Sequence, residues 1–155
     1  MQPIKVSVTV ERPREEVYAF LDVLGNHRSF TDHFLLDWTL SGPATGVGAK
    51  ARMRGKAPGG ASEWMDMEVV EAVAPERIVE KAVSGGGKRR TRGTYRLDAL
   101  DERRTRIEFE LAYEAAPAAD RVLAPVVRAW LRKANGRAME RLAAQLASDP
   151  APAAA

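Results

Sequence analysis

The sequence predicts a single α+β domain in which a meander of antiparallel strands precedes a long C-terminal helix. Its hydrophobic period is close to two from Leu35 to Ala115, as in strands, and changes to that of a helix from about Asp120. Short segments rich in Gly and Pro separate the alternating stretches, whereas parallel strands would need long crossovers. A chain of 155 residues, 45 % of them hydrophobic, is sufficient for one core.

The N-terminal part predicts a strand followed by helices. Apolar and polar residues alternate from Ile4 to Val10, which is typical of a half-buried strand. Pro13 suits the first turn of a helix, and the apolar spacing from Val17 to Leu24 continues that helix until Gly25. A second short helix or turn is expected over residues 26–30.

The alternating stretches that follow predict the rest of the sheet. They begin near Leu36 and end with "TRIEFELAYE", and the segments "GPATGVG", "APE", "SGGGK" and "DERR" supply turns. The final helix is expected from about Asp120 to Ala147, with Pro125 in its first turn or at a kink near its start. We expect one domain over residues 1–148 and a disordered tail over residues 149–155.

Composition excludes several classes of protein. The absence of Cys excludes disulfides, thiolate metal sites and a Cys nucleophile, and it fits a reducing cytoplasm. The start "MQPIKVSVTVERP" contains no signal-peptide core, and no apolar stretch approaches the ~18 residues of a membrane span. A formal net charge of +3 is a weak argument for a nucleic-acid partner. We expect a cytoplasmic protein with no nucleic-acid partner and no transmembrane segment.

The motifs of common cofactor sites are missing as well. With two His residues and no Cys, the chain lacks the ligand pattern of a usual metal site. No phosphate-binding loop or dinucleotide glycine fingerprint is present, and "SGGGK" is explained as a hairpin tip. We therefore expect neither a metal nor a cofactor.

The order and lengths of these elements resemble the helix-grip fold of the SRPBCC superfamily. That superfamily includes START domains, Bet v 1-type proteins and the bacterial polyketide cyclase/dehydrase group. The resemblance covers roughly residues 2–147 and rests on "ERPREEVYAFL", "GPATGVGAKARMR", "VVEAVAPERIVEKAVSGGG" and "RGTYRLDAL". It implies a curved antiparallel sheet of about seven strands, in the order β-α-α-β6-α, wrapped around the C-terminal helix with an internal apolar cavity.

One stretch, "SEWMDMEVVE", carries unusual side chains for a strand. Met65 and Met67 lie on one face, and Trp64 lies among carboxylates on the other. Met suits irregular or changing surroundings better than a tightly packed core. The resemblance places a cavity wall here, lined by the two Met residues or alternatively by Trp64, because one bulge reverses the faces. The other interpretation is that both Met residues fill an awkward corner of the core.

Aromatic and Met side chains, with one His, form the candidate ligand-binding set. Apolar pockets are lined by such residues with a few polar groups among them, although each aromatic alone is more often a core residue. Tyr95 and Tyr113 are favoured, since a buried hydroxyl needs a hydrogen-bond partner. The set comprises Phe30, His33, Phe34, Trp38, Met53, Trp64, Met65, Met67, Tyr95, Phe109, Tyr113 and Trp130.

Polar residues near this set allow acid–base chemistry without requiring it. His33, beside Asp32 and six residues after His27, is either a general base near the cavity mouth or a surface residue. Arg52 or Arg54 could anchor a carboxylate or an enolate. Two strand carboxylates could converge in the cavity, but we expect most of them to face water opposite the Arg-rich strands: Glu63, Asp66, Glu68 and Glu80.

Three functions follow from this interpretation. The leading one is binding or transport of a hydrophobic small molecule, such as a lipid, isoprenoid or polyketide-like compound, by a monomer or homodimer. The second is a cofactor-independent cyclase, aromatase or dehydratase, which requires at least two titratable groups facing the cavity. The third is a protein-interaction module, which requires an exposed apolar patch. The sequence assigns no catalytic residue.

Overall fold

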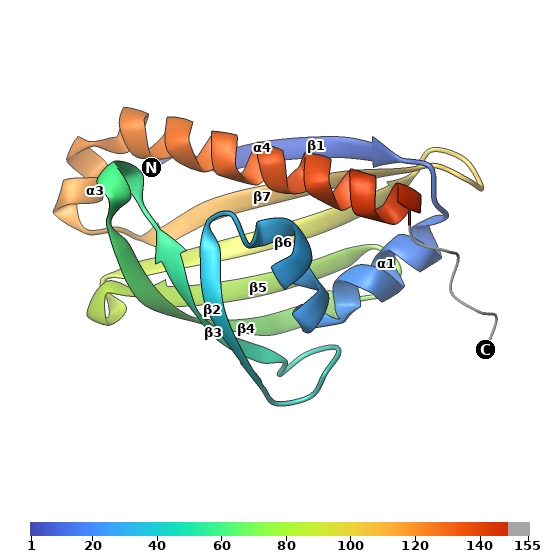
Figure 1. Ribbon diagram of the computed structural model, residues 1–155, viewed down its shortest axis with the longest axis horizontal. Coiled ribbons are helices and arrows are strands. Elements are labelled where there is room, and N and C mark those ends of the chain that lie inside the picture. Colours follow the sequence, from blue (N-terminus) through green and yellow to red (C-terminus); the bar gives the residue numbers. More distant parts are fainter. Residues whose placement is uncertain (149–155) are drawn as a thin grey trace.

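The computed structural model describes residues 1–148, in which a strand and helical segments precede six strands and a C-terminal helical region (Figure 1). The strands are β1 (Ile4–Val10), β2 (Leu35–Ser41), β3 (Lys50–Lys56), β4 (Ser62–Val73), β5 (Arg77–Ser84), β6 (Arg89–Ala99) and β7 (Thr105–Ala115). The helices are α1 (Arg14–Asp22), α2 (Arg28–Thr31), α3 (Ala118–Val122) and α4 (Ala124–Ser148). Short 3-10 turns are η1 (Leu24–His27), η2 (Pro58–Gly60) and η3 (Gly85–Gly87). The expected disordered tail lies outside the described residues.

All seven strands form one antiparallel sheet in the order β1-β7-β6-β5-β4-β3-β2. The first strand pairs with the last, so β1 and β2 are the two edges. The sheet curves around α4, which packs along β1 (Figure 1). The predicted helix-grip fold of the α+β class is therefore confirmed. None of the helices in residues 1–148 is long and apolar enough to cross a membrane.

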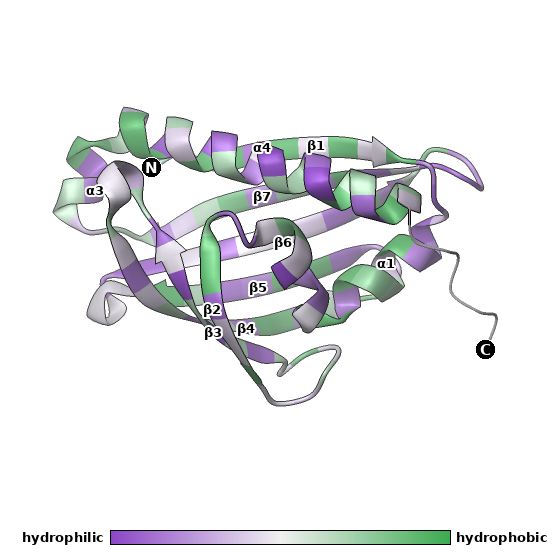
Figure 2. Ribbon diagram, in the orientation of Figure 1, coloured by the Kyte–Doolittle hydropathy of each residue, from purple (hydrophilic) through white to green (hydrophobic). Residues whose placement is uncertain are grey.

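Apolar and polar side chains alternate along each strand, which gives the sheet one apolar face against which α4 packs. Figure 2 shows apolar and polar residues alternating along the strands. On β5, for example, Ile78 and Ala82 are buried on the inner face, while Val83 is exposed on the other face. A period of two therefore gives the sheet one face toward the helix and one toward solvent.

The C-terminal helix begins differently from the sequence prediction. A single helix was expected from about Asp120, but α3 ends at Val122 and α4 begins at Ala124. Pro125 lies in the first turn of α4, where its missing N–H removes no helical hydrogen bond. Leu123, which the sequence places in the apolar stripe, lies at the break and is 54 % exposed.

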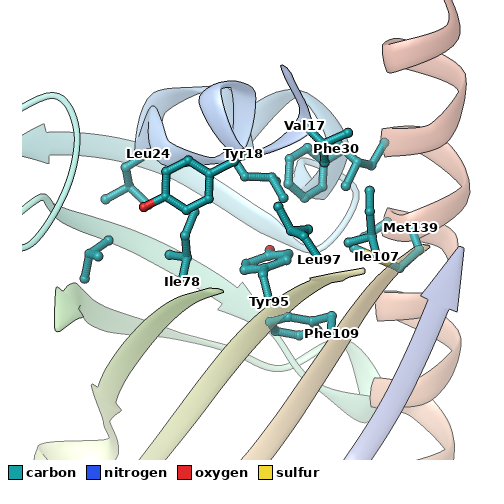
Figure 3. Packing of buried hydrophobic residues seen from close by; sticks show 14 of the residues in the cluster. Val17, Tyr18, Leu24, Phe30, Ile78, Tyr95, Leu97, Ile107, Phe109 and Met139 are labelled. Carbon is teal, nitrogen blue, oxygen red and sulfur yellow. The ribbon is translucent and has the colours of Figure 1, made fainter. Parts of the chain in front are cut away.

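One end of the interior, on the side of α1, is solidly packed. Figure 3 shows Val17 of α1, Phe30 of α2 and Met139 of α4 gathered over Leu97 and Ile107 of the sheet. All five side chains are buried. Helix α1 packs on β5 and β6, so it closes the sheet at this end. We call this region, from α1 to the C-terminal half of α4, the packed end.

Candidate functional site

A pocket of about 160 Å³ lies between the sheet and α4, away from the packed end. Strands β2 to β7 form its walls, η1 and α2 contribute one side, and the N-terminal half of α4 covers it. Apolar atoms form most of its surface, and polar or charged side chains from several elements lie among them. We call this region the hollow end.

Most of the candidate ligand-binding residues line this pocket. They come from the segment after α2, from four different strands and from α4. These segments are distant in the sequence, so it is the fold that brings the side chains together. Phe34 and Trp130 pack edge to face with their ring centroids 6.2 Å apart, so the two rings form one wall. The lining candidates are Phe34, Trp38, Met65, Met67, Tyr95, Phe109, Tyr113 and Trp130.

The open question about the faces of β4 is answered by the sheet register. Met65 and Met67 pair with Met53 and Ala51 of β3, and both Met side chains face the pocket. Trp64 points the other way and is 47 % exposed. The Arg52 guanidinium lies 5.2 Å from the centre of the Trp64 ring on this outer surface. The inclusion of Trp64 in the pocket was therefore wrong.

Three further candidates lie outside the pocket lining. Phe30 is completely buried in the packed end, so its ring is a core side chain. Met53 is also completely buried, in the core cluster beneath the sheet. His33 sits between α2 and α4 rather than in the pocket wall.

His33 has both ring nitrogens occupied. Nε2 lies 2.9 Å from the Ala134 carbonyl oxygen and therefore donates, while Nδ1 accepts from Arg141 Nη1 at 2.8 Å. Arg141 also pairs with Asp32 at 2.6 Å. Burial lowers the pKa of His33, and the adjacent Arg141 lowers it further. This His therefore joins α2 to α4 and has no free nitrogen for a general base.

The pocket lies where two neighbouring strands, β5 and β6, carry small side chains at the same level of the sheet. Ala82 of β5 pairs with Thr91 of β6, and Thr91 pairs with Tyr113 of β7. At the next level, Gly93 of β6 has no side chain at all. These positions leave a volume that α4 covers without filling.

Glu80 lies at the inner limit of this space. It pairs with Gly93, and a Cβ atom at Gly93 would approach Glu80 Oε1 and Phe109 Cε2 to 3.0 Å. Glycine therefore gives the carboxyl group room to lie on the inner face of the sheet. Glu80 is only 6 % exposed, and its Oε2 atom has no hydrogen-bond partner within residues 1–148. Most of the four strand carboxylates were expected to face water, and Glu80 is one that does not.

His27 of η1 faces Glu80 across the pocket floor. Its Nδ1 atom lies 3.8 Å from Glu80 Oε2, and the ring packs edge to face on Tyr95. Nε2 lies 2.7 Å from the Leu21 carbonyl oxygen, which only accepts, so Nε2 carries a hydrogen. His27 is 2 % exposed, so protein groups of α1 and η1, and not water, hold its ring in place.

Burial keeps both members of this pair neutral. It lowers the pKa of His27 to about 4, against the raising effect of the Leu21 hydrogen bond, and it raises the pKa of Glu80 to about 8. At 3.8 Å the pair has no direct hydrogen bond, so an ion pair here would not recover the free energy of desolvating two charges. Burial and Glu80 also raise the pKa of the Tyr95 hydroxyl.

At the opposite end, the pocket is bordered by charged residues. Arg89 of β6 binds Asp120 of α3 through two hydrogen bonds, of 2.7 and 2.8 Å, and forms an ion pair with Glu63 of β4. All three line the pocket beside η2 and η3. We call this group the mouth cluster; it lies near α3, at the left of Figure 1.

The two arginines proposed as anchors from the sequence point outward. Arg52 pairs with Asp66 at 3.1 Å, and Arg54 pairs with Asp37 at 2.9 Å, all on the exposed face of the sheet. Neither Arg89 nor the Glu80–His27 pair was singled out from the sequence as a main polar group of the site. Glycine opposite a Glu on a neighbouring strand was the one available signal, and it needs the strand register to be seen.

A family model described as "Polyketide cyclase / dehydrase and lipid transport" matches residues 1–147 of this chain. Among the curated proteins, no sequence matches this chain. The predicted resemblance to the SRPBCC superfamily is thereby confirmed over nearly the whole chain.

Several solved structures share the fold. A protein of Thermus thermophilus is 18 % identical, with a TM-score of 0.72 over 96 % of this chain and 100 % of its own. Norcoclaurine synthase from Thalictrum flavum is 12 % identical, with a TM-score of 0.72 over 96 % of this chain and 87 % of its own. The Zhui aromatase/cyclase from a Streptomyces species is 16 % identical, with a TM-score of 0.68 over 94 % of this chain and 93 % of its own. At these identities the likeness establishes the fold alone.

Proposed function

Because the chain belongs to the polyketide cyclase/dehydrase and lipid transport family, we propose that it binds a compact hydrophobic molecule between the sheet and α4. The observation that carries this proposal is the pocket of about 160 Å³ with mostly apolar walls. An engineered protein cavity of about 150 Å³ binds benzene, so this volume suits one or two small rings. Burial of apolar ligand surface contributes about 25 cal/mol per Å². Met65 and Met67 can adjust to ligands of different shape.

Native mass spectrometry of freshly purified protein, followed by melting temperatures with a library of small aromatic and lipid compounds, tests this proposal. A bound ligand raises the melting temperature by mass action. Ala82→Phe places a ring inside the pocket and is expected to abolish the shift. Val83→Phe, on the outer face of the same strand, is the matched control and should keep it. The proposal fails if no compound shifts the wild-type protein, or if both variants respond equally.

The Glu80–His27 pair favours a second candidate, an acid–base enzyme of the cyclase type. Intramolecular aldol condensation moves a proton from a carbon between two carbonyl groups, forms a carbon–carbon bond and releases water. Neutral His27 offers a bare Nδ1 that can accept that proton, and protonated Glu80 can donate one to the attacked carbonyl oxygen. Both groups line the pocket.

A synthetic poly-β-ketone thioester distinguishes the two candidates. If the protein is an enzyme, the wild type forms a cyclised product detectable by liquid chromatography and mass spectrometry. Glu80→Gln should then lower the rate by about a hundredfold or more while the compound still binds. If the wild-type protein binds the compound without converting it, the enzyme hypothesis is rejected and the carrier or sensor function is supported.

A further inference from the structure

We infer that the molecule bound in the pocket carries a hydroxyl group, phenolic, enolic or alcoholic, which lies between Glu80 Oε2 and His27 Nδ1. The inference rests on the proposed function. It adds the chemical class of the ligand and the way in which the ligand is oriented in the pocket. The apolar body of the molecule would extend from the Glu80–His27 floor toward the Met65 and Trp130 walls.

The first observation is the unpartnered carboxyl oxygen. Glu80 Oε2 is buried and makes no hydrogen bond within the described part of the chain, whereas buried polar atoms of native proteins are nearly always paired. Its side chain belongs to the pocket lining. A ligand atom is therefore the natural partner for this oxygen.

The second observation is the orientation of His27. Because its Nε2–H donates to the Leu21 carbonyl, the neutral ring presents Nδ1 as a hydrogen-bond acceptor toward Glu80. The floor of the pocket thus contains an acceptor on one side and a carboxyl group on the other. The two atoms are 3.8 Å apart, so one ligand oxygen can lie about 2.8 Å from both.

The third observation is the position of the positive charges. Apart from His27, the basic residues that line the pocket are Lys56 and Arg89. Arg89 pairs with Ser84, four residues along β5 from Glu80, which places it roughly 13 Å away along the strand. Lys56 pairs with Ser62 at the outer end of β3. No neighbouring cation in the lining therefore favours an ionised Glu80, and a buried carboxyl without one stays protonated.

A protonated carboxyl donates one hydrogen bond, and a neutral imidazole Nδ1 accepts one. A hydroxyl group matches both at once, because it accepts from Glu80 and donates to His27. A methyl group leaves both protein atoms unpaired, and a carboxylate has no hydrogen for His27. An ammonium group would bring a charge into a buried site where neutral Glu80 and neutral His27 provide no counter-charge. The hydroxyl therefore fits the floor best.

Three single-ring probes of nearly equal size test the inference: toluene, phenol and benzylamine. Their dissociation constants are measured by calorimetry with the wild-type protein, Glu80→Leu and Glu80→Gln. In the wild type, phenol should bind at least as tightly as toluene, although water solvates phenol better. Glu80→Leu should weaken phenol about tenfold relative to toluene. Glu80→Gln keeps a donor and should restore the preference for phenol. Lys81→Leu, on the outer face of β5, should leave all ratios unchanged.

The possible outcomes separate the two proposals. If toluene binds and the ratio of phenol to toluene affinity is unaffected by Glu80→Leu, the hydroxyl inference is wrong while the pocket function stands. Tighter binding of benzylamine than of phenol would also overturn it, because Glu80 would then be a carboxylate. If no ring binds to any variant, the pocket function fails and the inference fails with it.

Discussion

The packed end and the hollow end of the interior share strands β5, β6 and β7, yet these strands carry different side chains at the two ends. At the packed end, Ile78, Leu97 and Ile107 are at most 2 % exposed and pack under α1 and α4 (Figure 3). Toward the other end, the corresponding inner positions of β5 and β6 are Ala82 and Thr91. Smaller inner side chains on β5 and β6, together with the absence of α1 from the pocket lining, therefore accompany the change from a filled core to a pocket.

This comparison shows why the polar pair lies where it does. Glu80 and Gly93 occupy the level of the sheet between Ile78 and Ala82, at the boundary of the two regions. On one side the Leu21 carbonyl and the rings of Phe30 and Tyr95 hold His27 in place, and on the other side the buried carboxyl group of Glu80 adjoins the pocket. A buried carboxyl group is tolerated at the margin of a core more easily than inside it.

The largest expected difference between the ends comes from truncating one Leu of α4 at each. Leu142→Ala, at a completely buried position, should lower the free energy of unfolding by about 3 kcal/mol, because it leaves a cavity. Leu131→Ala, about three turns earlier on the pocket wall, should cost about 1 kcal/mol, since existing free volume adjoins it. Urea denaturation measures both. Equal losses would mean that the two ends are packed alike.

The second expectation concerns pH and the boundary between the ends. Unfolded Glu80 ionises near pH 4.5, but folded Glu80 does so near pH 8, so the folded state holds the extra proton and stability falls as pH rises. His27, with its pKa lowered from 6.5 to about 4, has the opposite slope between those values. The slopes nearly cancel from pH 4.5 to 6.5, and from pH 6.5 to 8 the protein should lose about 2 kcal/mol.

Glu80→Gln should remove that loss, as measured by denaturation at pH 6.5 and pH 8. Glu68→Gln, at an exposed position of β4, is the control and should retain it. If the loss persists in Glu80→Gln, the buried carboxyl is not its source.

The third expectation reverses the size change. Ala138→Leu at the packed end adds methylene groups to a site that is 2 % exposed, and it should cost about 1–2 kcal/mol through overpacking. Ala82→Leu projects into the pocket and should change stability by less than about 0.5 kcal/mol. Thermal denaturation compares them. A large loss of stability in Ala82→Leu would mean that the pocket has no room for a larger side chain at this position.

The smallest expected effect lies outside both ends. Trp64→Ala removes an exposed ring and its contact with Arg52, and it should cost about 0.5 kcal/mol. It should leave the affinity for pocket ligands unchanged, whereas Met65→Ala on the inner face should alter that affinity. Calorimetry with toluene separates these outcomes. A loss of binding in Trp64→Ala would place its ring in the pocket after all.

The fold was predictable from the sequence because its signals are local and repeated. Alternation along each strand, turn residues between strands and the helical spacing near the C-terminus all agree, so element order followed directly. The break at Leu123 escaped prediction, because the helical apolar spacing continues through that residue. Pro125 indicated only that the helix begins or bends nearby.

The site was predictable in part. Aromatic and Met residues at inner positions are recognisable from period and size, and Met65, Met67 and Trp130 do line the pocket. Burial of His27 and Glu80 depends on which residues of distant segments pack together, and a charged residue in a strand usually faces water. Trp64 was misplaced because alternation defines two faces without saying which one is inner.

Gly93 and Glu80 are expected to vary together among related sequences. Glycine within a strand lowers its stability by roughly 0.5–1 kcal/mol relative to alanine, so its presence there requires compensation. Since the Glu80 side chain occupies the space that a β-carbon would need, substitutions at the two positions should be correlated among relatives. A chain with a short apolar residue in place of Glu80 would lose one of the two contacts that exclude alanine opposite, and alanine there together with a smaller residue in place of Phe109 would identify homologues whose binding chamber has a non-polar floor.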